Sequence, residues 1–165
     1  FDQIKILMSD NKYEEAKDGL LEFISTNPKE TVAINQYLNC LIELKQFEEV
    51  DTFIQSLEEE MKDTEEIKKI IKKMEIIKKN ESGPNIEELI GKLNEKPNNI
   101  DLIIEVSDKY FSMQNYENSL DILLKNYPKN REKIKNKMVE FFDVLGNSNE
   151  FTVEYRKKLS QVMFS

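Results

Sequence analysis

The chain has 165 residues, about the length of one domain, and 34% of them are charged. With 32 acidic against 24 basic residues, its net charge of −8 argues against a surface that binds nucleic-acid phosphates. Only four Gly and four Pro are present, which disfavours an all-β sandwich or barrel and favours a mostly helical chain. The sequence has no His and one Cys, which excludes His-based catalytic triads, His-ligated metals and an internal disulfide.

A repeated pattern begins at residues 11–28, where Asn-Lys-Tyr-Glu-Glu-Ala is followed by spaced apolar residues up to Pro28. The pattern returns 34 residues later with residues of the same kind: Tyr13, Ala16, Leu20 and Phe23 correspond to Phe47, Val50, Ile54 and Leu57. An interval of 34 residues is the period of the tetratricopeptide repeat (TPR), which both segments resemble. Pro28 stands where that motif places its proline between repeats, and Lys62 takes this position in the second copy.

The middle of the chain predicts two more helices. The first runs from about Thr64 to Lys79, because its apolar residues are three or four positions apart: Ile67, Ile70, Ile71, Met74 and Ile77. The strongest turn signal of the chain follows, with Gly83 next to Pro84. A short helix up to Pro97 is then marked by Ile86, Leu89, Ile90 and Leu93.

A third copy of the repeat lies at residues 110–120, with Tyr116 in the aromatic position and Ser119 in the small position. Pro128 then interrupts the chain, and an amphipathic helix ending at Gly146 is marked by Ile134, Met138, Phe141, Phe142 and Leu145. Ser148 or Asn149 is expected to cap the last helix. The apolar face of that helix comprises Phe151, Tyr155, Leu159, Val162 and Met163.

These elements predict an all-α fold: about ten helices in antiparallel pairs that stack into a TPR-like solenoid, with an amphipathic C-terminal helix. We divide this continuous domain into three segments. Residues 1–62 hold two TPR-like repeats, residues 63–127 a degenerate repeat and the third repeat, and residues 128–165 the C-terminal capping or docking helices.

Features that often carry chemistry have structural explanations here. Cys40 lies between apolar neighbours, as a core cysteine does. The acidic run at residues 58–66 lacks the glycine-containing calcium loop and suits a solvated helix start. The lysines of the predicted helix at residues 64–79 are expected on its solvent side. We therefore expect no catalytic residues, no cofactor, no metal ligands and no enzyme activity.

Two other kinds of partner are disfavoured. Basic segments near the C-terminus lie beside aromatic residues, a combination that suits single-stranded RNA. However, these aromatic residues fall on the apolar faces of helices, so nucleic acid is not expected as a partner. No apolar run approaches the about 18 residues that a membrane span needs, so no membrane partner is expected either.

An ordered series of C-terminal motifs resembles a known family. The series comprises Pro97-Asn98-Asn99, residues 115–124, residues 141–146 and Tyr155-Arg156-Lys157-Lys158-Leu159. It resembles the C-terminal TPR domain of the bacterial thioredoxin-like co-chaperones, the chaperedoxin or YbbN/CnoX-like family. The resemblance implies that a thioredoxin-like domain precedes residue 1 and carries the disulfide chemistry. It also implies that the last helix docks to a GroEL-type chaperonin.

The resemblance thus implies a cytoplasmic, non-catalytic protein–protein interaction domain of a co-chaperone. Its partners would be unfolded clients, a chaperonin and its own thioredoxin-like domain. The candidate protein-binding residues are Tyr155, Arg156, Lys157, Lys158, Leu159, Val162, Met163 and Phe164. Two alternatives stay open: a TPR scaffold that binds an extended peptide in another bacterial assembly, and a last helix that only caps the solenoid.

Overall fold

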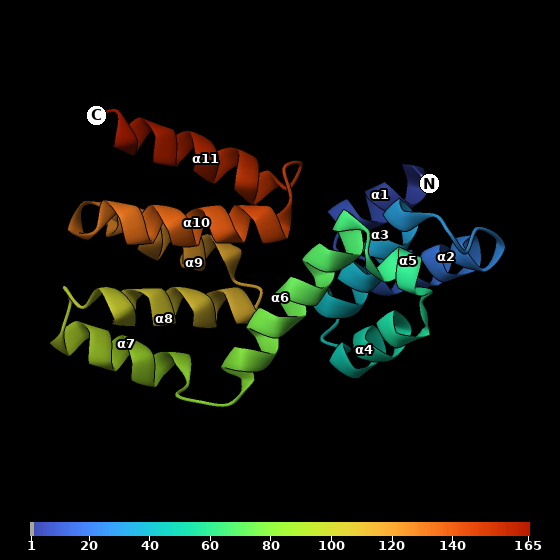
Figure 1. The fold of residues 1–165 in the computed structure, drawn as a ribbon, viewed down its shortest axis with the longest axis horizontal. Helices are drawn as coiled ribbons and strands as arrows, with labels where there is room; N and C mark the ends of the chain where they lie inside the picture. Colours follow the sequence, from blue (N-terminus) through green and yellow to red (C-terminus); the bar gives the residue numbers. More distant parts are fainter. Residues whose placement is uncertain (1) are drawn as a thin grey trace. The chain divides into compact units, whose positions relative to one another are not determined.

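The computed structural model describes residues 2–165, which form eleven α-helices and one short 3-10 helix (Figure 1). This confirms the predicted all-α fold. The first helices are α1 (Asp2–Ser9), α2 (Tyr13–Thr26), α3 (Thr31–Glu43), α4 (Phe47–Ser56), α5 (Glu59–Lys62) and α6 (Glu65–Glu81). The others are α7 (Ile86–Glu95), α8 (Ile100–Ser112), α9 (Tyr116–Lys125), the 3-10 helix Tyr127–Lys129, α10 (Arg131–Leu145) and α11 (Glu150–Met163).

The chain forms two compact units that divide within α6. The first unit ends at Ile71, and the second unit runs from Lys72 to Ser165. The net charge is unevenly shared between them. The first unit has 8 basic and 17 acidic residues, a net charge of −9, whereas the second has 16 basic and 15 acidic residues, a net charge of +1.

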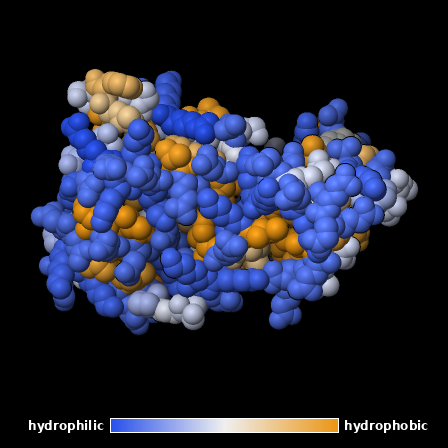
Figure 2. All heavy atoms as spheres, viewed as in Figure 1, coloured by the Kyte–Doolittle hydropathy of each residue, from blue (hydrophilic) through white to orange (hydrophobic). Residues whose placement is uncertain are grey.

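In each unit, helices that follow one another in the chain pack side by side, as a repeat solenoid requires. In the first unit, α2 lies against α1 and α3, and α3 also contacts α4. In the second unit, α8 lies between α7 and α9, and α11 packs on both α9 and α10. Apolar side chains fill the spaces between helices, so Figure 2 shows hydrophobic residues only as patches on a mostly hydrophilic face.

Three turns between paired helices have the same backbone geometry. Asn11, Lys45 and Gln114 each adopt a left-handed conformation with φ of 59°. In each turn, the next N–H donates to the carbonyl five residues earlier, at 2.8 to 2.9 Å, which defines a Schellman motif. The first two turns are 34 residues apart and the third follows after 69 more, about twice the TPR period. The repeat predicted from side chains is therefore also present in the backbone.

The position that the repeat pattern reserves for a small residue is buried in all three copies. Ala16, Val50 and Ser119 are all completely buried. Ser119 also donates a hydrogen bond from its hydroxyl to the carbonyl of Ser107, at 2.7 Å, which joins α9 to α8. A larger side chain at this position would force the two helices apart.

Asparagine side chains cap five of the helices. Each accepts a hydrogen bond from a backbone N–H in the first turn, which satisfies a donor that the helix itself leaves free. The capping residues are Asn85, Asn99, Asn115, Asn130 and Asn149. Of the two residues predicted to cap the last helix, Asn149 does so.

The structure corrects one expectation in the middle of the chain. The helix predicted from Thr64 to Lys79 is α6, and it buries Ile67, Met74 and Ile77 as expected. Lys73, expected on the solvent side, is only 6% exposed, and its ammonium lies 5.1 Å from the ring centre of Tyr116. A lysine can be buried in this way because its long apolar stem packs while the charge faces an aromatic ring.

Candidate functional site

The predicted binding residues on α11 divide between its two faces. Tyr155 and Leu159 are buried and belong to the hydrophobic core of the second unit. The Tyr155 hydroxyl donates a hydrogen bond to Oδ1 of Asp121 on α9, at 2.5 Å. Burial, and then the hydrogen bond to Asp121, raise the pKa of Tyr155 above its ordinary value. These two residues therefore attach α11 to the second unit and are not accessible to a partner.

The outer face of α11 combines apolar and cationic side chains. Val153 is 60% exposed and Phe164, just after the helix, is 83% exposed. Arg156 and Lys157 are exposed between them, three or four residues after Val153 on the same side of the helix. We call Val153, Arg156, Lys157 and Phe164 the outer stripe of α11. Val153 was not among the predicted residues, although its spacing from Arg156 and Lys157 could have revealed it.

The remaining predicted residues of α11 lie beside the outer stripe. Val162 and Met163 are half-buried and pack against the core. The Lys158 ammonium forms an ion pair with Glu154 at 2.9 Å and lies 4.6 Å from the ring centre of Tyr155. The hydrogen bond to Glu154 raises the pKa of Lys158, so this residue stays charged across the physiological range. The guanidinium of Arg156 lies 5.6 Å from the ring centre of Phe142, which gives the exposed charge a fixed position.

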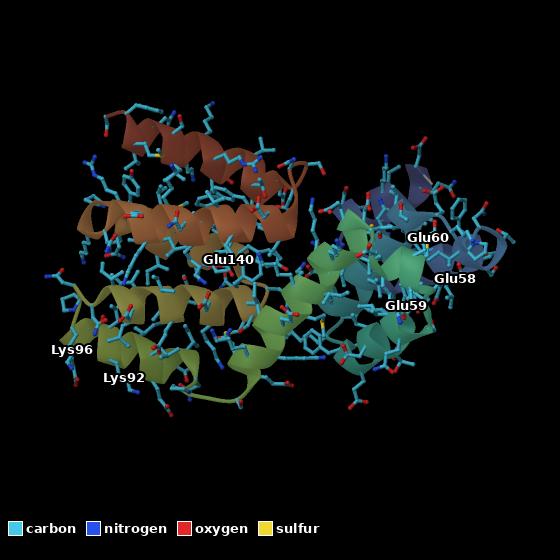
Figure 3. The ribbon with its side chains drawn as sticks, viewed as in Figure 1. Glu58, Glu59, Glu60, Lys92, Lys96 and Glu140 are labelled. Carbon is cyan, nitrogen blue, oxygen red and sulfur yellow. The ribbon has the colours of Figure 1, made fainter. Side chains whose placement is uncertain are left out.

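A polar hollow of about 190 Å³ lies between α8, α10 and the second half of α6, within the second unit. Asp108 on α8 forms an ion pair with Lys137 on α10 at 3.0 Å, and Lys137 also contacts Glu140 at 3.1 Å. Figure 3 shows Glu140 on the side of α10 that faces α8. The hollow is also lined by Lys72, Glu75, Ile76, Lys79 and Asn80. We call it the charged hollow.

The central ion pair of the charged hollow is largely shielded from solvent. The side chains of Asp108 and Lys137 are 15% and 17% exposed. Burial raises the pKa of Asp108, and Lys137 opposes this shift. Burial alone would lower the pKa of Lys137, but Asp108 and Glu140 raise it above its ordinary value. The lysine therefore remains charged and joins α8 to α10, and the hollow offers paired charges to a ligand.

The other chemical candidates have structural positions. Cys40 is completely buried in α3, and burial raises the pKa of its thiol to about 11. Glu58 and Glu59 of the acidic run are exposed and form ion pairs with Lys29 and Lys62. In residues 2–165, no group of three or more potential ligands is placed to hold a metal ion. Across the same residues, every helix is too short or too polar to span a bilayer.

Paired helices in a 34-residue register, joined by identical turns and packed through small residues, define a helical-repeat protein of the TPR type. The family model described as the tetratricopeptide repeat matches residues 79–164, and the chain belongs to this family. TPR domains are in general non-catalytic scaffolds that bind other proteins.

Among solved structures, the chain is similar to a domain of protein VP0806, of unknown function, from Vibrio parahaemolyticus RIMD 2210633. The two are 21% identical with a TM-score of 0.48, and the match covers 98% of this chain and 96% of that chain. The comparison with curated proteins gives no match.

Proposed function

We propose that this TPR chain is the partner-binding part of a thioredoxin-like co-chaperone, and that the outer stripe of α11 docks to a GroEL-type chaperonin. The observation that carries the proposal is an exposed apolar and cationic stripe on a helix whose other face is fixed in the core. The C-terminal motif series that resembles the chaperedoxins supplies the kind of partner. The same resemblance suggests cytoplasmic clients in an unfolded state.

The outer stripe has the chemistry of a helix that lies in an apolar groove. Such helices present apolar anchors on one side, and Val153 and Phe164 lie on the same side of α11, about three turns apart. Burying the exposed Phe164 in a partner would contribute about 1.5–3 kcal/mol, and Arg156 and Lys157 would speed the encounter with an acidic surface. The buried Tyr155 and Leu159 keep the helix formed before it binds, which lowers the entropic cost of docking.

The test uses point variants of the full chain, because deleting α11 would also remove core residues of the second unit. We expect the double variant Val153→Asp with Phe164→Asp to bind purified chaperonin at least about tenfold more weakly, since both apolar anchors are lost. The matched control is Val32→Asp on α3, another exposed valine, which should bind as the wild type does. Far-UV circular dichroism checks that each variant stays helical.

Two results would contradict this proposal. One is a wild-type chain that shows no binding to the chaperonin in surface plasmon resonance. The other is a double variant that binds as tightly as the control.

The charged hollow favours a second candidate function, the binding of an extended peptide in another assembly. Repeat solenoids bind partners on extended concave surfaces, and the charged hollow offers Asp108, Lys137 and Glu140 from α8 and α10 to such a peptide. If this function is correct, Lys79→Glu in the hollow should weaken partner binding while the double variant of α11 leaves it unchanged. The opposite pattern supports docking through α11.

A further inference from the structure

A shortened helix in the first unit leaves a pocket. α2 has 14 residues and α4, its counterpart one repeat later, has 10. With the 34-residue register, α4 would continue to Glu60, but it ends at Ser56. Leu57 and Glu58 are extended instead, both with ψ of 148°, and lead the chain into α5. The chain therefore leaves the helical path of α4 at the residues that line the pocket.

The pocket has a volume of about 250 Å³ and a mostly apolar lining, with Lys29, Ser56 and Glu58 as its polar members. Phe53 and Leu57 are only half-buried, so each keeps apolar surface that faces the hollow. Phe53 is held in place by Tyr37, whose ring centre is 4.9 Å away. The rest of the apolar lining comprises Ile24, Pro28, Ile34 and Met61, which gives a preformed site between four helices. We call it the α4–α5 pocket.

The size of the pocket indicates its occupant. Sites for small organic ligands have volumes of about 300–1,000 Å³, so this pocket is smaller than that class. Its volume suits one large side chain, and single aromatic or aliphatic anchors that fill such pockets dominate many protein interfaces. Because Phe53, Leu57 and Met61 line it, the side chain that fills it must be apolar.

The surroundings of the pocket indicate the charge of the partner. Glu58 lines the pocket, Glu59 and Glu60 follow it in α5 (Figure 3), and the whole first unit has a net charge of −9. Glu58 is paired with Lys29 at 3.4 Å, but both side chains are about two-thirds exposed, at 66% and 69%. An exposed pair of this kind is weak, so a lysine or arginine of a partner can replace Lys29.

We propose that the α4–α5 pocket binds one large apolar side chain from a partner segment that carries lysine or arginine on both sides of it. The pocket selects the anchor residue, and the acidic side chains around Glu58 select the flanking charges and speed the encounter. The interaction uses none of the residues of α11 or of the charged hollow, so it is additional to the function proposed above.

The experiment titrates the full chain with a nine-residue peptide that has a central phenylalanine and two lysines on each side. Two comparison peptides replace the phenylalanine by alanine or the lysines by glutamates. Binding is measured by NMR chemical shifts of backbone amides in the chain. We expect the first peptide to shift the amides of Phe53, Leu57 and Met61, and both comparison peptides to bind at least about tenfold more weakly.

Variants of the chain locate the site. Ser56 is exposed at the edge of the α4–α5 pocket, so Ser56→Phe should fill this pocket and weaken binding of the first peptide at least about tenfold. Glu58→Lys should weaken it about threefold to tenfold at low salt and less at high salt. The matched control is Glu87→Lys, an exposed glutamate in the first turn of α7, which should leave binding unchanged.

Several results would overturn the proposal. If the alanine peptide binds as tightly as the phenylalanine peptide, the interaction is only a general attraction between a polycation and an acidic chain. The same conclusion follows if Glu58→Lys and Glu87→Lys weaken binding equally. If the wild-type and Ser56→Phe chains bind the first peptide with equal affinity, the pocket is not the binding site. The proposal is also wrong if no peptide shifts any backbone amide at millimolar concentration. If the wild-type chain self-associates in sedimentation equilibrium and Ser56→Phe abolishes this, the occupant of the pocket is a second copy of the chain. Binding of chaperonin by the α11 variants is a separate measurement and fails or succeeds independently.

Discussion

Replacing Lys45 by glycine should stabilise the first unit. Lys45 has φ of 59°, a conformation that costs an L-residue about 1–2 kcal/mol and costs glycine nothing. Against this gain, glycine loses about 0.5–1 kcal/mol more conformational entropy on folding. Lys45 is exposed, so removing its side chain sacrifices little packing. The difference predicts a gain of about 0.5–1 kcal/mol in the free energy of unfolding for Lys45→Gly.

The gain is measured by urea denaturation followed by far-UV circular dichroism, and by a rise in Tm of about 1–4 °C. Lys45→Ala is the matched control: it removes the same side chain but keeps a β-carbon, so it should bring no gain. Lys135→Gly, in the middle of α10, should instead destabilise by about 1 kcal/mol, because glycine is unfavourable in a right-handed helix. The reasoning is refuted if Lys45→Gly is no more stable than Lys45→Ala.

Three other predictions concern the core. Ser119→Ala should lower the free energy of unfolding in urea by about 1 kcal/mol, because the hydrogen bond to Ser107 is lost. Ser119→Leu should lower it by about 1–3 kcal/mol, because the larger side chain overfills the contact with α8. Equal stability of the wild type and both variants would contradict this. Because the folded pKa of Tyr155 is raised, its contribution to stability is fully present below about pH 10, the unfolded value, and declines as the pH rises further. Urea denaturation between pH 9 and 11 should show that the free energy of unfolding falls less steeply with pH in Tyr155→Phe than in the wild type. The same slope in both chains would contradict this prediction. Cys40, buried and with its pKa raised to about 11, should react with a thiol reagent at pH 8 far more slowly in the folded chain than in urea, and equal rates would refute its burial.

The repeat register was predictable from the sequence because few residue types suit the positions that define it. Only a small side chain fits where Ser119 meets α8, and an aromatic residue at Tyr116 begins the next helix. The left-handed turns were not predictable in the same way. Asn11 is of a residue type that tolerates this conformation, but Lys45 and Gln114 give no such signal, and their geometry follows from the hydrogen bonds that end the preceding helix.

The functional surfaces were only partly predictable. The amphipathic pattern of α11 placed Tyr155 on the apolar face and Arg156 outside it, and the structure agrees. The family resemblance, in contrast, grouped both residues in one binding motif, although only Arg156 is accessible to a partner. The α4–α5 pocket had no sequence signal of its own. The pocket lies where α4 ends early at Ser56, and the local sequence does not forbid another helical turn there.

The unequal charge of the two units makes ionic strength act on them differently. A net charge of −9 on 71 residues repels itself in the compact state, whereas a net charge of +1 on the other 94 does not. Added salt screens the repulsion between exposed charges that are more than about 10 Å apart at 0.1 M. Amide hydrogen exchange should therefore slow with salt in the helices that precede Ile71, and stay nearly constant in those that follow Lys72. Salt can thus stabilise the first unit of this repeat protein against local opening while leaving the stability of the second unit nearly unchanged.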